Sequence, residues 1–145
     1  MKPSVRVRRV LTRAGVLAAF GLSTLSVAGA QAATAYITNE KDNTVSVIDL
    51  DKLEVVKTVK VGQRPRGIIM NADGTEIFVC TSDDNRITVL DAKTLEIKYH
   101  LPSGPDPELF ILHPDGRTLY IANEDDNMVT VTDVIDKEII DEIPV

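Results

Sequence analysis

A repeat of 42 residues constrains this chain more than any other feature of its sequence. Its aromatic member recurs at Tyr36, Phe78 and Tyr120, and no insertion or deletion interrupts the register from residue 35 onward. A fixed period of about 40 to 45 residues predicts a repeat architecture. The other repeated positions are Asn43, Asn85 and Asn127; Asp49, Asp91 and Asp133; Gly62 and Gly104; Pro65 and Pro107; Asp73 and Asp115; and Gly74 and Gly116.

The middle repeat, residues 66–101, indicates what one unit is. Short runs of apolar or alternating residues, rich in β-branched types, are separated by Asp-Gly or Asn-containing turns, which is the pattern of antiparallel strands. Four strands in a unit of this length are typical of a β-propeller blade. We name the strands A to D from the propeller axis outward and expect them at Arg66–Asn71, Ile77–Thr81, Ile87–Asp91 and Glu96–Leu101.

The predicted fold class is therefore all-β, a β-propeller of four-stranded antiparallel blades. Residues 33–145 would form about 2.6 blades: strands B to D of blade 1 over 35–61, blade 2 over 66–101 and blade 3 over 108–145. Because a closed ring needs at least about four blades, we expect a fragment of a longer propeller. The alternative is a ring that several short chains assemble together.

The first 32 residues have a different character. They contain five basic and no acidic residues, an apolar run from Ala14 to Ala28, and small residues around Ala30 and Ala32. This order predicts a cleaved secretory signal and a periplasmic protein. The apolar run is too short and too rich in Gly and Ser for a membrane span. The pair Arg8-Arg9 leaves twin-arginine export open beside general secretion.

Removal of the predicted signal makes the protein strongly acidic. Residues 1–32 hold five of the 16 basic residues and none of the 22 acidic ones, so 11 basic and 22 acidic residues remain, a formal net charge of −11. This charge repels nucleic acid and anionic lipid, so we expect neither as a partner and no membrane insertion after cleavage. It would attract a cationic partner, or it serves only to keep the protein soluble.

The D-to-A crossovers of consecutive blades carry opposite charges at equivalent positions. Alternating strand direction places them at the same end of the blades as the B–C turns. One crossover presents two guanidinium groups and the other two carboxylates. They could form a ligand or partner site in which arginine binds a carboxylate or phosphate, or an ion pair that fixes blade spacing. The candidate residues are Gln63, Arg64, Arg66, Asp106 and Glu108.

Other polar residues give weaker indications of a functional site. The acidic B–C turns could suggest calcium, but Asp and Asn also stabilise turns without a metal. Cys80 is the only cysteine and aligns with small residues, so we expect it to be a packing residue. His100 and His113 lie at different levels of the blade and predict no metal site. We therefore expect a protein without metal, cofactor or catalytic residues.

The segment Tyr36-Ile37-Thr38-Asn39, followed by residues 43–49, resembles the YVTN-family β-propeller repeat, and residues 119–133 match it almost as well. The resemblance covers residues 35–145. Residues 61–67, 103–110 and 121–126 are, more narrowly, similar to exported propellers associated with pyrroloquinoline quinone-dependent alcohol catabolism. This resemblance implies a non-catalytic accessory role beside a quinoprotein dehydrogenase or a c-type cytochrome. It does not imply that this chain binds the quinone.

An enzymatic alternative comes from the same class of repeats. More distantly, the units resemble the propeller domain that holds haem d in nitrite reductases, although no axial ligand is identifiable here. A lactonase-like hydrolase is the other enzymatic possibility. Either activity would need residues beyond the blades in this sequence.

Overall fold

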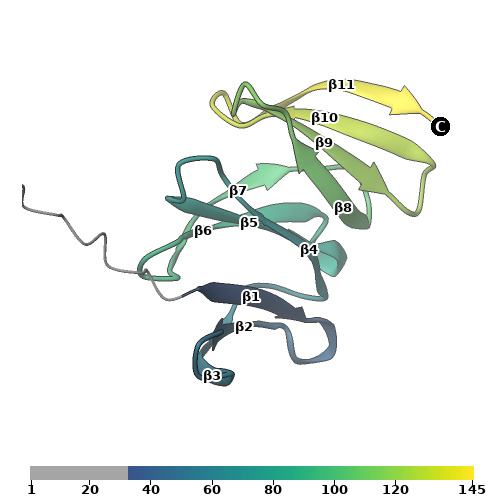
Figure 1. Cartoon of the computed structure of the whole chain (residues 1–145). Coiled ribbons are helices and arrows are strands. Elements are labelled where there is room, and N and C mark those ends of the chain that lie inside the picture. The colour runs from purple at the N-terminus through teal and green to yellow at the C-terminus, as the bar shows by residue number, and fades with distance from the viewer. Residues whose placement is uncertain (1–32) are drawn as a thin grey trace, which may run out of the picture. The chain divides into compact units, whose positions relative to one another are not determined.

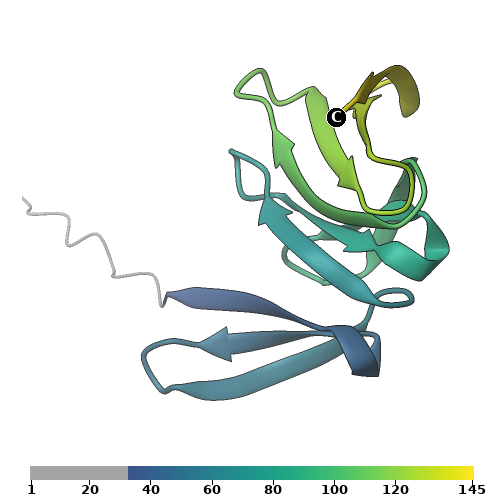
Figure 2. The same cartoon turned by 90° about the vertical axis from the view of Figure 1, so that its right-hand side faces the viewer.

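A computed structural model describes residues 33–145, and the predicted signal at residues 1–32 lies outside the described part. These residues form three antiparallel sheets, which follow one another along the chain and are fanned around a common side (Figures 1 and 2). The all-β prediction of partial propeller blades is confirmed. No helix within the described residues is long and apolar enough to cross a bilayer.

Each sheet is one blade. Blade 1 is three-stranded in the order β1-β2-β3, while blade 2 (β4-β5-β6-β7) and blade 3 (β8 to β11) have four strands each. Since β1 pairs with β2 as strand B pairs with strand C in the other blades, blade 1 consists of strands B to D. The strands are β1 Thr34–Asn39, β2 Thr44–Asp49, β3 Glu54–Lys60, β4 Pro65–Met70, β5 Glu76–Thr81, β6 Arg86–Asp91, β7 Ile97–Pro102, β8 Pro107–Leu112, β9 Thr118–Asn123, β10 Met128–Asp133 and β11 Glu138–Pro144.

Successive side chains of strand B in blade 2 point to opposite faces of the sheet, and both faces are buried. Ile77 and Val79 of β5 pack toward blade 1, whereas Phe78 and Cys80 pack toward blade 3, and all four are at most 1% exposed. Two hydrophobic cores result, one at each interface between blades. The first contains Val45, Val47, Val61, Ile77, Val79, Leu90 and Leu95; the second contains Phe78, Cys80, Ile87, Val89, Leu101, Leu119, Ile121 and Val134.

The repeated Asp after strand C stabilises the C–D turn. Asp91 Oδ1 accepts the backbone N–H groups of Lys93 at 2.9 Å and Thr94 at 2.8 Å. These hydrogen bonds, above all that from Thr94, lower the pKa of the Asp91 carboxyl below its ordinary value. Asp49 and Asp133 make the same pair of bonds to the second and third residues after them. The Asp repeat is thus explained by turn chemistry.

The repeated Asn and Gly residues occupy left-handed backbone conformations. Asn43, Asn85 and Asn127 end the B–C turns with φ of 59°, 51° and 54°. Asn tolerates this region better than most residues, because its short side chain can bond locally. Gly74 and Gly116 have φ of 72° and 71° in the A–B turns, where a residue with a Cβ would be strained. The repeat therefore preserves backbone geometry as well as the apolar core.

Candidate functional site

The two D-to-A crossovers are held in place by the Asn residues of the B–C turns. Asn43 Oδ1 accepts the N–H of Arg64 at 2.8 Å, and Asn85 Oδ1 accepts the N–H of Asp106 at 2.9 Å. Arg64 and Asp106 both adopt left-handed conformations, with φ of 48° and 46°. The carbonyls of these residues accept the N–H groups of Ser82 and Glu124, each at 3.1 Å. Both crossovers thus share one backbone geometry, which sets where their side chains begin.

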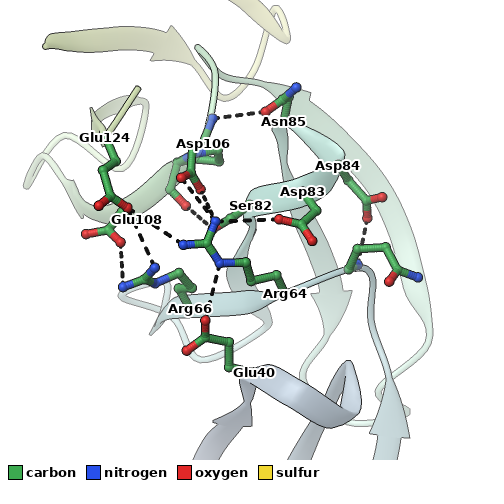
Figure 3. Close-up of polar contacts among 12 residues, drawn as sticks. Glu40, Arg64, Arg66, Ser82, Asp83, Asp84, Asn85, Asp106, Glu108 and Glu124 are labelled. Carbon is green, nitrogen blue, oxygen red and sulfur yellow. Dashed lines mark hydrogen bonds and ion pairs between the residues drawn. The ribbon is translucent and has the colours of Figure 1, made fainter. Parts of the chain in front are cut away.

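Arg64 connects the three blades through its guanidinium group (Figure 3). Its Nη1 donates to both carboxylate oxygens of Asp106 in blade 3, at 3.0 and 3.1 Å. Its Nε donates to Glu40 of blade 1 at 3.2 Å, while Asp83 of blade 2 lies 3.5 Å from Nη1. Glu124 of blade 3 lies 3.7 Å from Nη2. The carboxylates of Asp106, Glu40 and Asp83, led by Asp106, raise the pKa of Arg64 above its ordinary value.

Arg66 forms a second connection between blades 2 and 3. Its Nη2 lies 2.5 Å from Glu108 Oε1, and its Nη1 lies 3.8 Å from Glu124. The hydrogen bond between Glu124 and Glu108, together with the negative charge of Glu108, raises the pKa of Glu124. Five carboxylates therefore surround two guanidinium groups, so this cluster has an excess of negative charge at neutral pH.

A cavity of about 290 Å³ adjoins Arg66. Its charged lining residues are Arg66, Glu40 and Glu108, and its apolar wall includes Leu109, which is 65% exposed. The backbone is close-packed behind it, because a Cβ on Gly67 would approach the carbonyl of Glu108 to 2.8 Å. The cavity and the ion pairs together form the candidate functional site.

The structure brings four of the five predicted site residues together. Arg64 pairs with Asp106, and Arg66 pairs with Glu108. Gln63 lies apart from these pairs: its N–H donates to Asp84 at 2.9 Å, and its Oε1 accepts from Asn43 at 3.0 Å. The geometry of the ion-pair alternative is therefore present. A role in binding a ligand or partner remains a prediction.

Sequence reasoning missed the contribution of the B–C turns to this cluster. The sequence presents Glu40, Asp83 and Glu124 as turn residues or calcium ligands, yet each contacts Arg64. The sequence does carry a signal for them, since alternating strand direction puts the B–C turns at the same end as the crossovers and Glu40 and Glu124 are repeat equivalents. Among residues 33–145, no group of three or more His, Cys, Asp or Glu side chains could hold a metal.

Cys80, His100 and His113 lie outside the cluster. Cys80 is buried in the core between blades 2 and 3, and burial raises the pKa of its thiol. The predicted packing role of Cys80 is thus confirmed. His100 contacts Thr88 Oγ1 through Nδ1 at 3.2 Å, and burial lowers its pKa. His113 lies in an A–B turn, 2.9 Å from Asp115.

The repeated four-stranded blades, the inter-blade cores and the crossovers define a β-propeller protein. Residues 26–139 match the family described as lactonase, 7-bladed beta-propeller. The match covers most of the sequence, and the chain belongs to this family.

Two solved structures show the same fold. Hydrazine synthase of Kuenenia stuttgartiensis superposes with a TM-score of 0.71 at 24% identity, covering 77% of this chain and 32% of that one. Streptogramin B lyase gives a TM-score of 0.63 at 19% identity, covering 77% of this chain and 37% of the other. This chain thus spans about a third of the length of each. A search of curated proteins gave no match.

Proposed function

We propose that this protein is a non-catalytic periplasmic binding module that is accessory to quinoprotein alcohol oxidation. The partner would be a pyrroloquinoline quinone-dependent dehydrogenase or a c-type cytochrome. The cellular setting rests on the signal-like residues 1–32 and on the resemblance of residues 61–67, 103–110 and 121–126 to exported propellers of this pathway. The binding surface would be the end of the blades that carries the crossovers and B–C turns.

The observation that carries the proposal is the charge balance around Arg64 and Arg66. Both guanidinium groups are occupied by carboxylates of the same chain, which makes them poor anchors for an anionic substrate. Three of the surrounding carboxylates remain more than half exposed: the side chains of Glu40, Asp83 and Glu124 are 51%, 58% and 55% accessible. Exposed negative charge of this kind increases the rate at which a positively charged protein surface associates.

The test is affinity capture with the tagged protein from the periplasm of cells grown on alcohol. We expect recovery of a quinoprotein dehydrogenase or a c-type cytochrome, with capture weakening as salt rises because the contact is electrostatic. Replacing Asp83 and Glu124 by Asn and Gln should weaken capture, whereas replacing the exposed Asp51 at the other end of the blades by Asn should not. Recovery of neither partner class would contradict the accessory role.

The family match favours a lactonase-like hydrolase as the second candidate function. Turnover of a lactone by the purified protein, without a partner, would distinguish this hydrolase from a binding module. Hydrolysis that is lost in Glu108→Gln, while thermal unfolding is unchanged, would support an enzymatic role for the cavity beside Arg66. If no lactone in a panel of ring sizes is hydrolysed, the binding module is favoured.

A further inference from the structure

A second cavity, of about 330 Å³, lies between blades 1 and 2 and has a different chemistry from the carboxylate-rich cluster. Two of its lining side chains are cationic, Lys60 at the end of β3 and Arg86 at the start of β6. The other lining residues are Asn43, Val61, Gly62, Gln63 and Ile97. Its volume lies at the lower end of the range typical of small-molecule sites, roughly 300 to 1,000 Å³.

The cationic groups of this cavity are only partly paired with hydrogen-bond acceptors or carboxylates of the described residues. The Nε of Arg86 is buried and has no hydrogen-bond partner among the described residues. Within the part of the chain that the structure describes, the guanidinium has one weak contact, from Nη2 to Asp84 Oδ2 at 3.4 Å. The Lys60 ammonium makes no ion pair with any residue of the described part. The Arg86 side chain as a whole is 40% exposed and lines the cavity, so it is accessible to a bound acceptor.

Among the described residues, Asp84 is the one acidic side chain that contacts the Arg86 guanidinium, and it also accepts a backbone hydrogen bond. The N–H of Gln63 donates to the same Oδ2 atom at 2.9 Å. Asp84 therefore holds the crossover in place and offsets one of the two positive charges. One positive charge remains in a described region whose formal net charge is −11. The lowered pKa of His100, caused by burial and then by the charge of Arg86, agrees with a positive local potential.

The repeat supplies an internal control for this arrangement. The positions equivalent to Lys60, Gln63 and Arg86 at the next interface are Pro102, Pro105 and Met128, which carry no charge. Both interfaces nevertheless form the same blade packing. The fold does not require the cations, so their presence at the first interface needs a separate explanation.

We propose that the cavity at Lys60, Gln63 and Arg86 binds a small oxyanion, a phosphate or a carboxylate. The planar guanidinium group of Arg86 matches the geometry of both oxyanions, and the ammonium of Lys60 adds a second charge. The amide of Gln63 and the backbone of Gly62 complete the polar lining. The site is separate from the Arg64 and Arg66 cluster and does not depend on the proposed accessory function.

Isothermal titration of the full chain with inorganic phosphate and with succinate, at constant ionic strength in sodium chloride, tests the proposal. We expect saturable binding of at least one probe, and the tighter one identifies the class. Arg86→Met copies the residue found at the next interface, so the fold should tolerate it, and it should weaken binding at least about tenfold. Lys60→Gln should weaken binding as well.

The matched control is Lys41→Gln, which removes the same charge from an exposed turn outside the cavity. Binding should be unchanged in this variant. The proposal is overturned if neither probe binds saturably, or if Lys41→Gln weakens binding as much as the two cavity variants do. Should Arg86→Met fail to fold, Lys60→Gln alone decides the outcome, because Lys60 is an exposed residue at a strand end.

Discussion

Arg64 and Asp106 occupy the same position in consecutive repeats, 42 residues apart, and their side chains form an ion pair at 3.0 Å across the interface between blades 2 and 3. Because this position contacts its equivalent in the next repeat, the same charged residue in both repeats would place like charges together. Opposite charges convert that repulsion into attraction. Arg66 and Glu108, two residues further along, follow the same rule.

We predict that Arg64→Asp lowers the melting temperature, because it places a second carboxylate beside Asp106, which is 8% exposed. The reciprocal double variant, Arg64→Asp with Asp106→Arg, should recover much of the loss. Both positions share one backbone conformation, so each residue is compatible with the other's place. Thermal unfolding followed by circular dichroism measures the effect. If the double variant is no more stable than Arg64→Asp alone, the pairing does not contribute to stability.

We predict that Asn85 stabilises the second crossover through both its side chain and its backbone. Asn85→Gly keeps the left-handed φ of 51° but removes the acceptor for the N–H of Asp106, and should cost about 0.5–1.5 kcal/mol. Asn85→Ala should cost about 1 kcal/mol more, because a Cβ is strained in that region. Urea unfolding gives both values. Equal losses for Gly and Ala would contradict the conformational contribution.

We predict that Phe78 is among the most important core residues, because it is 1% exposed in the core between blades 2 and 3. Phe78→Ala should reduce the free energy of unfolding by about 3–5 kcal/mol, the usual cost of such a truncation. Leu109→Ala is the matched control, since Leu109 is 65% exposed and should change stability by less than about 0.5 kcal/mol. Chemical denaturation compares the two, and similar losses would contradict the assigned core.

We predict an acid-dependent contribution from Asp115 in the A–B turn of blade 3. Hydrogen bonds from the backbone of Arg117 and Thr118 lower its pKa from 3.8 to about 2. A lowered pKa means that the stabilisation is present above the ordinary value and is lost as pH falls through the folded-state value. Asp115→Asn should therefore lower the melting temperature above about pH 4, and the difference should shrink toward pH 2. A difference that does not vary across this window would contradict the prediction.

The repeat made most of the fold predictable from sequence. Strand B was expected at Ile77–Thr81 and is observed at Glu76–Thr81, and the other three strands of blade 2 also agree to within one residue at each end. Such agreement arises because one turn pattern, Asp-Gly between A and B and Asn between B and C, recurs in register. The candidate cluster was predictable only in part. The charges of Arg64 and Asp106 were visible, but the approach of Glu40 and Glu124 depends on side chains from three blades.

The sequence by itself determined the period, the strand order within a blade and the end of the blades at which the crossovers lie. These follow from local rules, since turn residues and apolar alternation act over a few neighbours along the chain. Only the tertiary structure decided which charges are paired and which are left over. The tertiary structure pairs Arg64 with carboxylates from three blades, yet leaves the Nε of Arg86 without a partner among residues 33–145. Pairing depends on the distance between blades, and residues that are many positions apart in the sequence set that distance.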